Sequence, residues 1–515
     1  MKSILTHKLF IYIAPIFLGV FTSFSLPPYN FLIINFITFP FLLFLLIYNF
    51  EKSKWISFKI GWLFGFGYFV SNLYWIANAL TFEEIFKPLI PFALIIIPLF
   101  LGIFYGFVTL ICSFFYLKKN FSTVLIFATI FSLIEFIRGF VLGGFPWNMI
   151  AYSWVNYLNS IQILSLIGTY SFNLISITIF SLPFLIFFKK EIKIKILVIL
   201  LLLFILICNG FYGHIKIKND KKLYLKLKDF KIKVISPKIS INRFFQADNE
   251  AIIIEELIEL SNPNALQNTI FVFPEGALAG VNLDKLRNFK EIFTKKYSEK
   301  HKIIMGINIE KKIENSSKVY NSMVVLDNKL NLISEYNKIK LVPFGEFLPF
   351  ENFFKKFGLK KVGYGYASFI AGNERKLIST AFDNFNFIPL ICYEIIYSGK
   401  VRLKSDNANF IVNISEDGWF GDSIGPYQHF SHTIFRAIEE GKNIIRSTNN
   451  GISAYIDRNG IVISKIESTK KGVIEINNYK KFNETLFSKF GNKIFFYVLL
   501  FYIILIFFIK RWENK

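Results

Sequence analysis

Long apolar segments limit the possible fold of this chain more than any other feature. A helix needs roughly 20 apolar residues to cross the hydrocarbon core of a bilayer. Eight such stretches occur, seven before residue 212 and one after residue 490: about 9–26, 31–48, 58–78, 89–116, 123–141, 160–188, 194–211 and 492–509. The composition agrees, because 53% of the 515 residues are hydrophobic. We therefore expect an α-helical membrane bundle of about eight transmembrane helices.

Basic residues predict the orientation of this bundle, because Lys and Arg gather in short cytoplasmic loops. The loops 27–30, 79–88 and 142–159 contain a single residue of this kind, Lys87. Both termini are therefore expected in the cytoplasm, and seven crossings place the large soluble part on the opposite side. The alternate ends are rich in basic residues: Lys2, Lys8, Lys52, Lys54, Lys59, Lys118, Lys119, Lys189, Lys190, Lys193, Lys195, Lys510, Arg511 and Lys515.

The chain is predicted to have three parts: a seven-helix transmembrane bundle over 1–211, a soluble domain over 212–490, and a last transmembrane helix with its tail over 491–515. In the soluble part, short β-branched runs alternate with helical stretches, which favours an α/β fold. A long aromatic-rich stretch, 343–375, fits neither period. Predicted strands are 231–236, 269–274, 302–309, 321–327, 387–392, 408–415, 443–448 and 451–457, and predicted helices are 247–260, 283–299 and 427–441.

The formal net charge of +23 does not indicate a protein that binds nucleic acid. Many lysines lie in the loops assigned to the cytoplasm, and no stripe of basic residues alternates with aromatic ones. This distribution favours attraction to anionic lipid head groups instead. No cofactor or metal is expected, since His429 and His432 have helical i, i+3 spacing but no third ligand is apparent near them in the sequence.

Glu275 in FVFPEGA and Cys392 in LICYE come at the ends of predicted strands, and Lys338 in YNKIKLVPFGE is interpreted as a third strand end with a reactive side chain. Cys392 is the one cysteine of the soluble part, so no disulfide framework is possible there. A thiolate is a good nucleophile, a carboxylate can take its proton, and an ammonium lowers the thiol pKa. Because strand ends at one sheet edge converge, the three residues are candidates for an acyl-transfer site. Taken singly, each has an ordinary structural explanation.

Several motifs of this chain resemble one known family. They are LPPYN, SNLYWIANAL (71–80), IEFIRGFVLGGFPWN (134–148), QILSLIGTYSFN (162–173), FPEGA (273–277), YNKIKLVPFGEFLPFE (336–351), ICYEI (391–395), WFGDSIGPYQH (419–429) and RSTNNGISAYID (446–457). Together, in this order, they resemble the apolipoprotein N-acyltransferases, the membrane-embedded branch of the nitrilase, or carbon–nitrogen hydrolase, superfamily. The resemblance implies a nitrilase-like α-β-β-α sandwich beside the helical bundle.

The resemblance also implies roles for individual residues. It makes Glu275 the general base, Lys338 the stabiliser of the oxyanion and Cys392 the nucleophile. Glu346 matches a supporting carboxylate of the family. Three further residues match positions that line the family's site: Tyr393, Glu394 and Trp419.

The reaction that the resemblance implies is the last step of lipoprotein maturation in the bacterial inner membrane, with the soluble domain in the periplasm and no cofactor. An acyl chain passes from a membrane phospholipid through a Cys392 thioester to the α-amino group of an apolipoprotein's diacylglyceryl-cysteine. Two alternatives remain open from the residues. One is a membrane-anchored amidase or nitrilase that hydrolyses its thioester, and the other is a transporter that uses Glu135 and Arg138 in a substrate path.

Some positions leave their role open. The family commonly has Gln where Ser236 stands, and Ser-Asn-Asp-Ala where this chain has Ser-Glu416-Asp-Gly418, so we assign no substrate contact to these residues. Glu135 and Arg138 lie three residues apart in an apolar helix and share a face. Charges cost on the order of 2.5–3.5 kcal/mol there, so the pair is expected inside the bundle, as an ion pair or a head-group contact.

Overall fold

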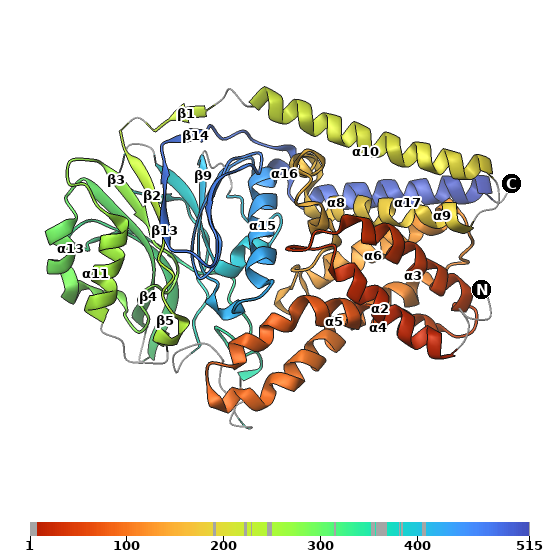
Figure 1. Cartoon of the computed structure of the whole chain (residues 1–515), viewed down its shortest axis with the longest axis horizontal. Helices are drawn as coiled ribbons and strands as arrows, with labels where there is room; N and C mark the ends of the chain where they lie inside the picture. The colour runs from red at the N-terminus through yellow and green to blue at the C-terminus, as the bar shows by residue number, and fades with distance from the viewer. Residues whose placement is uncertain are drawn as a thin grey trace.

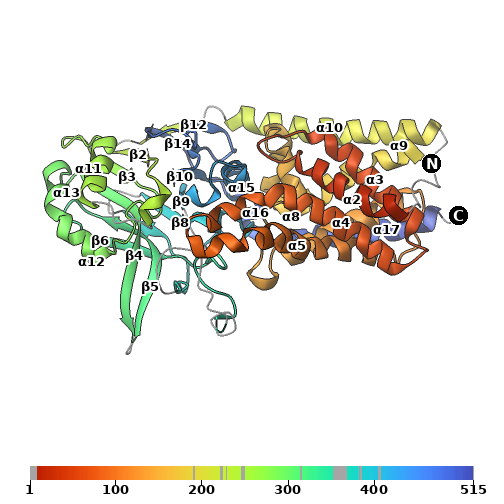
Figure 2. The same cartoon turned by 60° about the horizontal axis from the view of Figure 1, so that its bottom comes forward.

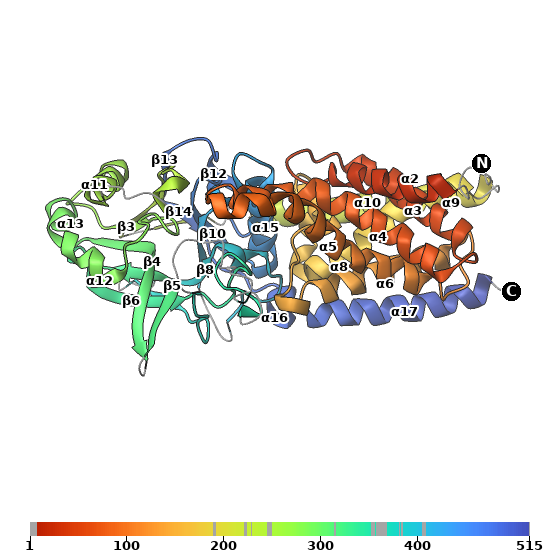
Figure 3. The same cartoon turned by 90° about the horizontal axis from the view of Figure 1, so that it is seen from below.

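The computed structural model describes residues 8–188, 192–220, 224–227, 229–244, 250–313, 316–351, 356, 368–380, 382, 385–403 and 408–513. These residues form an elongated molecule with an α/β body at one end and a helical bundle at the other (Figure 1). Helix α2 begins, and helix α17 ends, at the end of the bundle that is farthest from the α/β body (Figures 1 and 3). The bundle axis therefore points from the chain ends toward the α/β body.

The bundle contains every segment that the sequence predicted to cross the membrane. Among the described residues, however, only six helices are both long and apolar enough to span it, so the predicted number of eight is too high by this measure. Helix α2 has 16 residues, and α4 carries Lys54 and Lys59. The helices are α2 (Lys8–Ser23), α3 (Asn35–Asn49), α4 (Lys54–Leu73), α5 (Ile90–Cys112), α6 (Phe121–Arg138), α8 (Leu164–Ser181), α9 (Pro183–Phe188), α10 (Ile192–Asp220) and α17 (Lys493–Glu513).

Helix α10 links the bundle to the α/β body. It continues to Asp220, beyond residue 211 where the sequence placed the end of the seventh segment. The Asp220 carboxylate forms an ion pair of 3.0 Å with Arg458 of the α/β body. The helix therefore extends past the apolar stretch, because its last turns are held by polar contacts that hydropathy does not register.

Glu135 and Arg138 of α6 form an ion pair inside the bundle, with a distance of 2.6 Å and side chains that are 0% and 1% exposed. Arg138 also donates to the carbonyl oxygen of Phe145, and its guanidinium lies 5.3 Å from the centre of the Phe69 ring. The pair thus fixes the loop that follows α6. This burial favours the structural interpretation over a substrate path or a head-group contact.

The α/β body contains two six-stranded sheets, as the nitrilase-like prediction requires. The first sheet has the order β13 (Gly472–Ile476), β2 (Lys231–Ser236), β3 (Thr269–Val272), β4 (His301–Ile313), β5 (Ser316–Leu326) and β6 (Leu332–Asn337). The second has the order β12 (Val462–Ile466), β11 (Ser453–Ile456), β10 (Asn443–Asn449), β9 (Phe410–Glu416), β8 (Asn386–Ile391) and β7 (Ile378–Ser379). A small separate pair joins β1 (Tyr224–Lys226) to β14 (Asn478–Lys480).

The two sheets pack face to face and are covered by helices on both outer sides (Figures 1 and 2). Side chains such as Val234, Val272, Ile391 and Val412 fill the space between the sheets. Helices α11 (Glu250–Ser261), α12 (Leu283–Leu286) and α13 (Lys290–Lys296) cover the first sheet. Helix α15 (Gly425–Glu440) covers the second sheet and also contacts α8 of the bundle. The predicted α-β-β-α sandwich is confirmed.

Strand direction brings several chain segments to one edge of this sandwich. Strands β2, β3 and β4 are parallel, as are β8, β9 and β10. Strand β6 runs in the same direction as β4, because each is antiparallel to β5 between them. The carboxyl ends of β3, β4 and β6 therefore lie at one edge of the first sheet.

One prediction about the α/β body needs correction. The helix expected at 283–299 is divided into α12, a 3₁₀ turn at Arg287–Phe289 and α13, and it ends at Lys296. The stretch 343–375 has one isolated bridge, Pro343 with Phe347, among the residues that can be described. Most of its middle, at 352–355 and 357–367, lies outside the described residues.

Candidate active site

The side chains of Glu275, Lys338 and Cys392 come from the carboxyl ends of three strands. Glu275 follows β3, Lys338 is the first residue after β6, and Cys392 is the first after β8. Gly306 of β4 lets the Glu275 backbone approach closely, since a Cβ there would lie 2.6 Å from the Glu275 Cα. The strand ends thus converge, although the residues are far apart in the sequence.

Glu275, Lys338 and Glu346 form a buried charged cluster. The Lys338 Nζ lies 3.3 Å from Glu275 Oε1 and 2.9 Å from Glu346 Oε1, and the lysine side chain is 1% exposed. The Asn321 amide donates to both carboxylates, each at 2.7 Å. The backbone N–H of Glu416 donates to Glu275 Oε2 at 3.0 Å. Both oxygens of Glu275 are therefore held in place.

Burial sets the electrostatics of this cluster. It raises the pKa of Glu275, an effect that Lys338 opposes and Glu346 reinforces. Burial alone would lower the pKa of the Lys338 ammonium, but the two carboxylates outweigh it, so its pKa lies well above the usual value. Lys338 therefore stays positively charged, whereas Glu275 holds a proton more readily than an exposed glutamate.

Cys392 begins a short 3₁₀ turn, Cys392–Ile396, directly after β8. Its backbone has φ +47°, in the left-handed region that favours glycine, so the turn holds the thiol in a strained position. Burial raises the pKa of the thiol, the charge of Glu275 raises it further and Lys338 opposes both. The resting thiol is therefore protonated, and attack needs a base to remove its proton.

Glu394 is buried between the segment that carries Lys338 and the segment that carries Cys392. Its Oε1 accepts hydrogen bonds from the Tyr336 hydroxyl at 2.6 Å and the Ile339 backbone N–H at 3.0 Å, and it pairs with Arg375 at 3.2 Å. Its Oε2 accepts from the backbone N–H of Ile391 at 2.9 Å. The carboxylate thereby joins the segment that carries Lys338 to the segment that carries Cys392.

Tyr393 and Trp419 connect the site to the bundle. The Tyr393 hydroxyl donates to the carbonyl oxygen of Gly144 at 3.0 Å. The Trp419 ring packs edge-on against Phe82, with 5.7 Å between ring centres, and contacts Phe244 at 5.5 Å. The residue next to the candidate nucleophile therefore touches a loop of the membrane bundle.

Comparisons with known proteins identify the family. Residues 18–182 match the apolipoprotein N-acyltransferase N-terminal domain, and residues 249–477 match the carbon-nitrogen hydrolase domain. An apolipoprotein N-acyltransferase of Rickettsia prowazekii is 33% identical over 472 residues, which cover 89% of this chain and 92% of the relative. The chain belongs to the apolipoprotein N-acyltransferase family. The family resemblance drawn from the motifs is confirmed.

A second relative agrees with this assignment to the apolipoprotein N-acyltransferases. The one of Brucella melitensis is 29% identical over 475 residues, 89% of this chain and 87% of the relative. Among solved structures, Saccharomyces cerevisiae Nit3, a member of branch 10 of the nitrilase superfamily, has a TM-score of 0.35 and 15% identity. The match covers 52% of this chain and 95% of the Nit3 chain.

The positions where this family member departs from the common motif are buried. The Glu416 carboxylate forms a buried ion pair with Arg243 and accepts from Asn449 at 2.7 Å. A Cβ at Gly418 would lie 2.7 Å from Glu416 Oε1, so the glycine leaves room for this carboxylate. Ser236 donates to the Thr448 carbonyl oxygen at 3.3 Å and is buried.

A buried network behind Cys392 escaped the sequence analysis of this acyltransferase. His429 Nε2 lies 3.3 Å from the Cys392 carbonyl oxygen, which can only accept, so this nitrogen carries the hydrogen. His429 Nδ1 lies 2.9 Å from Asp417, which also pairs with Arg446 at 2.9 Å. His429 and Asp417 lie in the quoted motif WFGDSIGPYQH, but the sequence suggested only a metal role for the histidine.

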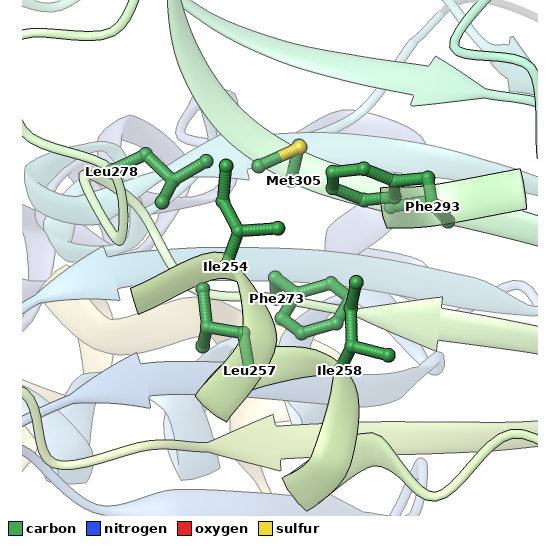
Figure 4. Close-up of a pocket in the computed structure, with 8 residues that line it drawn as sticks. Ile254, Leu257, Ile258, Phe273, Leu278, Phe293 and Met305 are labelled. Carbon is green, nitrogen blue, oxygen red and sulfur yellow. The ribbon is translucent and has the colours of Figure 1, made fainter. Parts of the chain in front are cut away.

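No metal site is apparent in the part of this acyltransferase that the structure describes. Those residues contain no group of three or more His, Cys, Asp or Glu that could hold a metal ion. A small cavity beneath α11 and α13 is lined by apolar side chains, among them Ile254, Phe273 and Met305 (Figure 4). It lies in the core that covers the outer face of the first sheet, so it is packing space rather than a polar binding site.

Proposed function

We propose that this chain transfers an acyl chain from a membrane phospholipid to the α-amino group of an apolipoprotein's N-terminal diacylglyceryl-cysteine. The family assignment supports N-acylation of lipoproteins and gives the amidase alternative no better support. The observation that carries the proposal is the position of Cys392, which has the Glu275–Lys338 cluster near it and the bundle contact of Tyr393 beside it. A thiol placed there can meet an ester that stays in the membrane.

The first step forms a thioester. Glu275 takes the proton of the Cys392 thiol while the sulfur attacks an ester carbonyl of the phospholipid, and Lys338 stabilises the oxyanion that develops. When the carbonyl re-forms, the carbon–oxygen ester bond breaks. The alkoxide takes the proton from Glu275 and leaves as a lysophospholipid. Glu346 holds Lys338 in position, and Asn321 holds Glu275 in position, during these proton transfers.

The second step transfers the acyl group. The neutral α-amine of the diacylglyceryl-cysteine attacks the thioester carbonyl, and Lys338 again stabilises the oxyanion. Glu275 takes a proton from the attacking nitrogen and returns it to the sulfur as the carbon–sulfur bond breaks. The products are an amide and the free Cys392 thiol, so the cycle consumes no cofactor.

The proposal includes the orientation of the chain. We propose that the bundle lies in a bacterial inner membrane with both termini in the cytoplasm and the catalytic domain, predicted over 212–490, in the periplasm. The lysine asymmetry between loops supports this orientation. So does the contact between Glu513, whose carboxylate accepts from the Phe121 backbone N–H at 2.9 Å, and the lysine-rich segment before α6.

Acyl-enzyme formation tests the function. Purified enzyme is incubated with phospholipid that carries a labelled acyl chain, without an acceptor. We expect one labelled acyl group per enzyme, released by hydroxylamine as thioesters are. Addition of a diacylglyceryl-cysteine peptide should move the label to the peptide amine with ping-pong kinetics.

Cysteine variants complete this test. Cys392→Ala should form no acyl-enzyme and no product, whereas Cys208→Ala, at an exposed cysteine of α10, should behave as the parent. Release of the label as free fatty acid, with none on the peptide, would favour the amidase reading. A labelled Cys392→Ala protein would identify another nucleophile.

A further inference from the structure

We propose that Arg243 and Glu416 form a positioning clamp for the general base, Glu275. This inference rests on the base role assigned under the proposed function. It starts from the place where this chain departs from its family's motif, since Glu416 stands where Asn is common. Arg243 contacts the residue that follows Glu275, and Glu416 contacts the Glu275 carboxylate itself.

Arg243 holds the backbone on one side of the base. Its Nε and Nη2 donate to the Gly276 carbonyl oxygen at 3.2 and 2.8 Å, and Gly276 follows Glu275 directly. Gly276 has φ +60°, so the chain turns sharply there. The remaining donor, Nη1, bonds the carbonyl oxygens of Ile239 at 3.2 Å and Ser240 at 2.7 Å. The planar guanidinium thus joins one loop to the residue after the base.

Glu416 holds the base from the other side. Its backbone N–H donates to Glu275 Oε2 at 3.0 Å. Its own carboxylate is fixed by Arg243, by Asn449 at 2.7 Å and by the Gly418 backbone N–H at 2.8 Å. The side chains of Arg243 and Glu416 are 1% and 2% exposed, so water does not replace these bonds. The ion pair therefore links both backbone anchors of the base.

The clamp has a consequence that a purely structural pair lacks. The hydrogen bond from Glu416 favours the ionised form of Glu275. The charged and titratable groups that face Glu275 are Lys338, Glu346 and Cys392. The hydrogen bonds of Arg243 and Glu416 given above do not involve these three groups. Loosening the clamp should therefore change the protonation of Glu275 as well as its position.

The test is the acid limb of the pH profile of kcat/KM for acyl-enzyme formation. Glu416→Gln and Arg243→Lys should move this limb up by roughly half to one pH unit, as expected for one weakened hydrogen bond. They should also lower the plateau about 10-fold or more, because the base is displaced. Lysine keeps the charge but cannot bond Gly276 and Glu416 with one planar group. A limb at the parental pH in both variants would overturn the clamp.

A matched control removes the general effect of breaking a buried ion pair. Lys480 of β14 pairs with Asp457 at 2.7 Å, and both side chains are 0% exposed. Asp457 follows β11, whose residue Ile456 pairs with Ile444 near the start of β10, so it lies at the edge opposite the base. Lys480→Met should leave the limb in place. A limb that moves equally in this control would count against the clamp.

Two further variants keep the test decisive. Where Glu416→Gln or Arg243→Lys does not fold, Arg243→Met/Glu416→Gln is measured, since it leaves no unpaired buried charge. It should still show the displaced limb, and a parental limb would overturn the proposal. Glu275→Gln serves as the benchmark: if it keeps the activity and the limb, the assignment of the base is wrong. If it loses both while the clamp variants match the parent, only the clamp is wrong.

Discussion

At the scale of single residues, the permanent positive charge of the site is on Lys338 and the candidate nucleophile is the neutral Cys392 thiol. Lys338 keeps its charge because two carboxylates outweigh the cost of burial, whereas burial keeps the Cys392 thiol protonated, and in the proposed mechanism Glu275 removes its proton. A permanently ionised thiolate would react with other electrophiles, whereas a thiol becomes a good nucleophile only where a base takes its proton.

The raised pKa of Glu275 predicts where the rate falls in acid. A general base works only in its deprotonated form, so acylation of Cys392 should decline as the pH drops through this pKa. The decline should lie above the range near pH 4.3 that an ordinary glutamate gives. The measurement is the rate of acyl-enzyme formation across pH. A profile that is flat down to pH 4.3 would contradict the assignment.

A second prediction at this scale concerns the role proposed for Lys338. Lys338→Ala should lower the rate of acylation by at least about 10²-fold, the loss typical of removing one oxyanion donor. Single-turnover kinetics with labelled phospholipid measure it. Lys340→Ala is the matched control, because Lys340 is exposed and two residues away, and it should retain the parental rate. Equal losses in both variants would argue against a specific role for Lys338.

At the scale of elements, the sequence revealed the buried strands and missed those at the margins. The strands found from β-branched runs, such as β3, β9 and β10, are buried along their whole length. The missed strands β6 and β12 are largely half-exposed, so their polar residues hide the pattern. A hydropathy pattern reveals a strand only where its side chains are buried. A strand at or near a sheet edge has few buried side chains, so the pattern is weak there.

The same limit applies to the site. Glu275, Lys338 and Cys392 lie in recognisable motifs, so a resemblance could select them. Arg243 carries no such signal, because its importance depends on Glu416, a partner that is remote in sequence and that only the folded chain brings near. A pair whose members are remote in sequence can be recognised only in the folded structure.

The joint between α15 and the bundle gives a prediction about stability. The indole N–H groups of Trp75 and Trp147 both donate to Gln428 Oε1, at 3.2 and 2.8 Å, and the Gln428 amide donates to Asn72 at 3.1 Å. Gln428→Leu leaves both indole donors unpaired in a buried place, at roughly 1–3 kcal/mol each. Thermal unfolding in detergent should show a lower midpoint than for the control Tyr427→Phe. An unchanged midpoint would mean that the joint contributes little.

At the scale of the whole molecule, the elongated shape separates two environments. The start of α2 and the end of α17 lie at one end of the bundle, and the α/β body, with the strand ends that carry Glu275, Lys338 and Cys392, lies beyond the other (Figure 1). In the proposed orientation, with both termini in the cytoplasm, this shape would place the site at the outer surface of the membrane, where the proposed lipid-modified substrates are anchored. The length of the bundle would then set how far Cys392 lies from the cytoplasm.

Reporter fusions test this orientation. Fusions after residue 120 or 192 should report the cytoplasm, and fusions within 220–480 should report the periplasm, because the basic loops stay inside. A pair of reporters that are active on opposite sides provides the internal control. A cytoplasmic signal from 220–480 would contradict both the orientation and the proposed function.

Helix α15 has one face on the second sheet and the other on the bundle, and nearly all of its residues are buried. Separating the catalytic domain from the bundle would expose Gln428, Phe435 and their neighbours to water. The exposed apolar surface would favour aggregation. The soluble half cannot serve as a convenient stand-in for inhibitor screening or crystallisation. Any compound meant for this enzyme has to be found with the intact protein in a lipid or detergent environment.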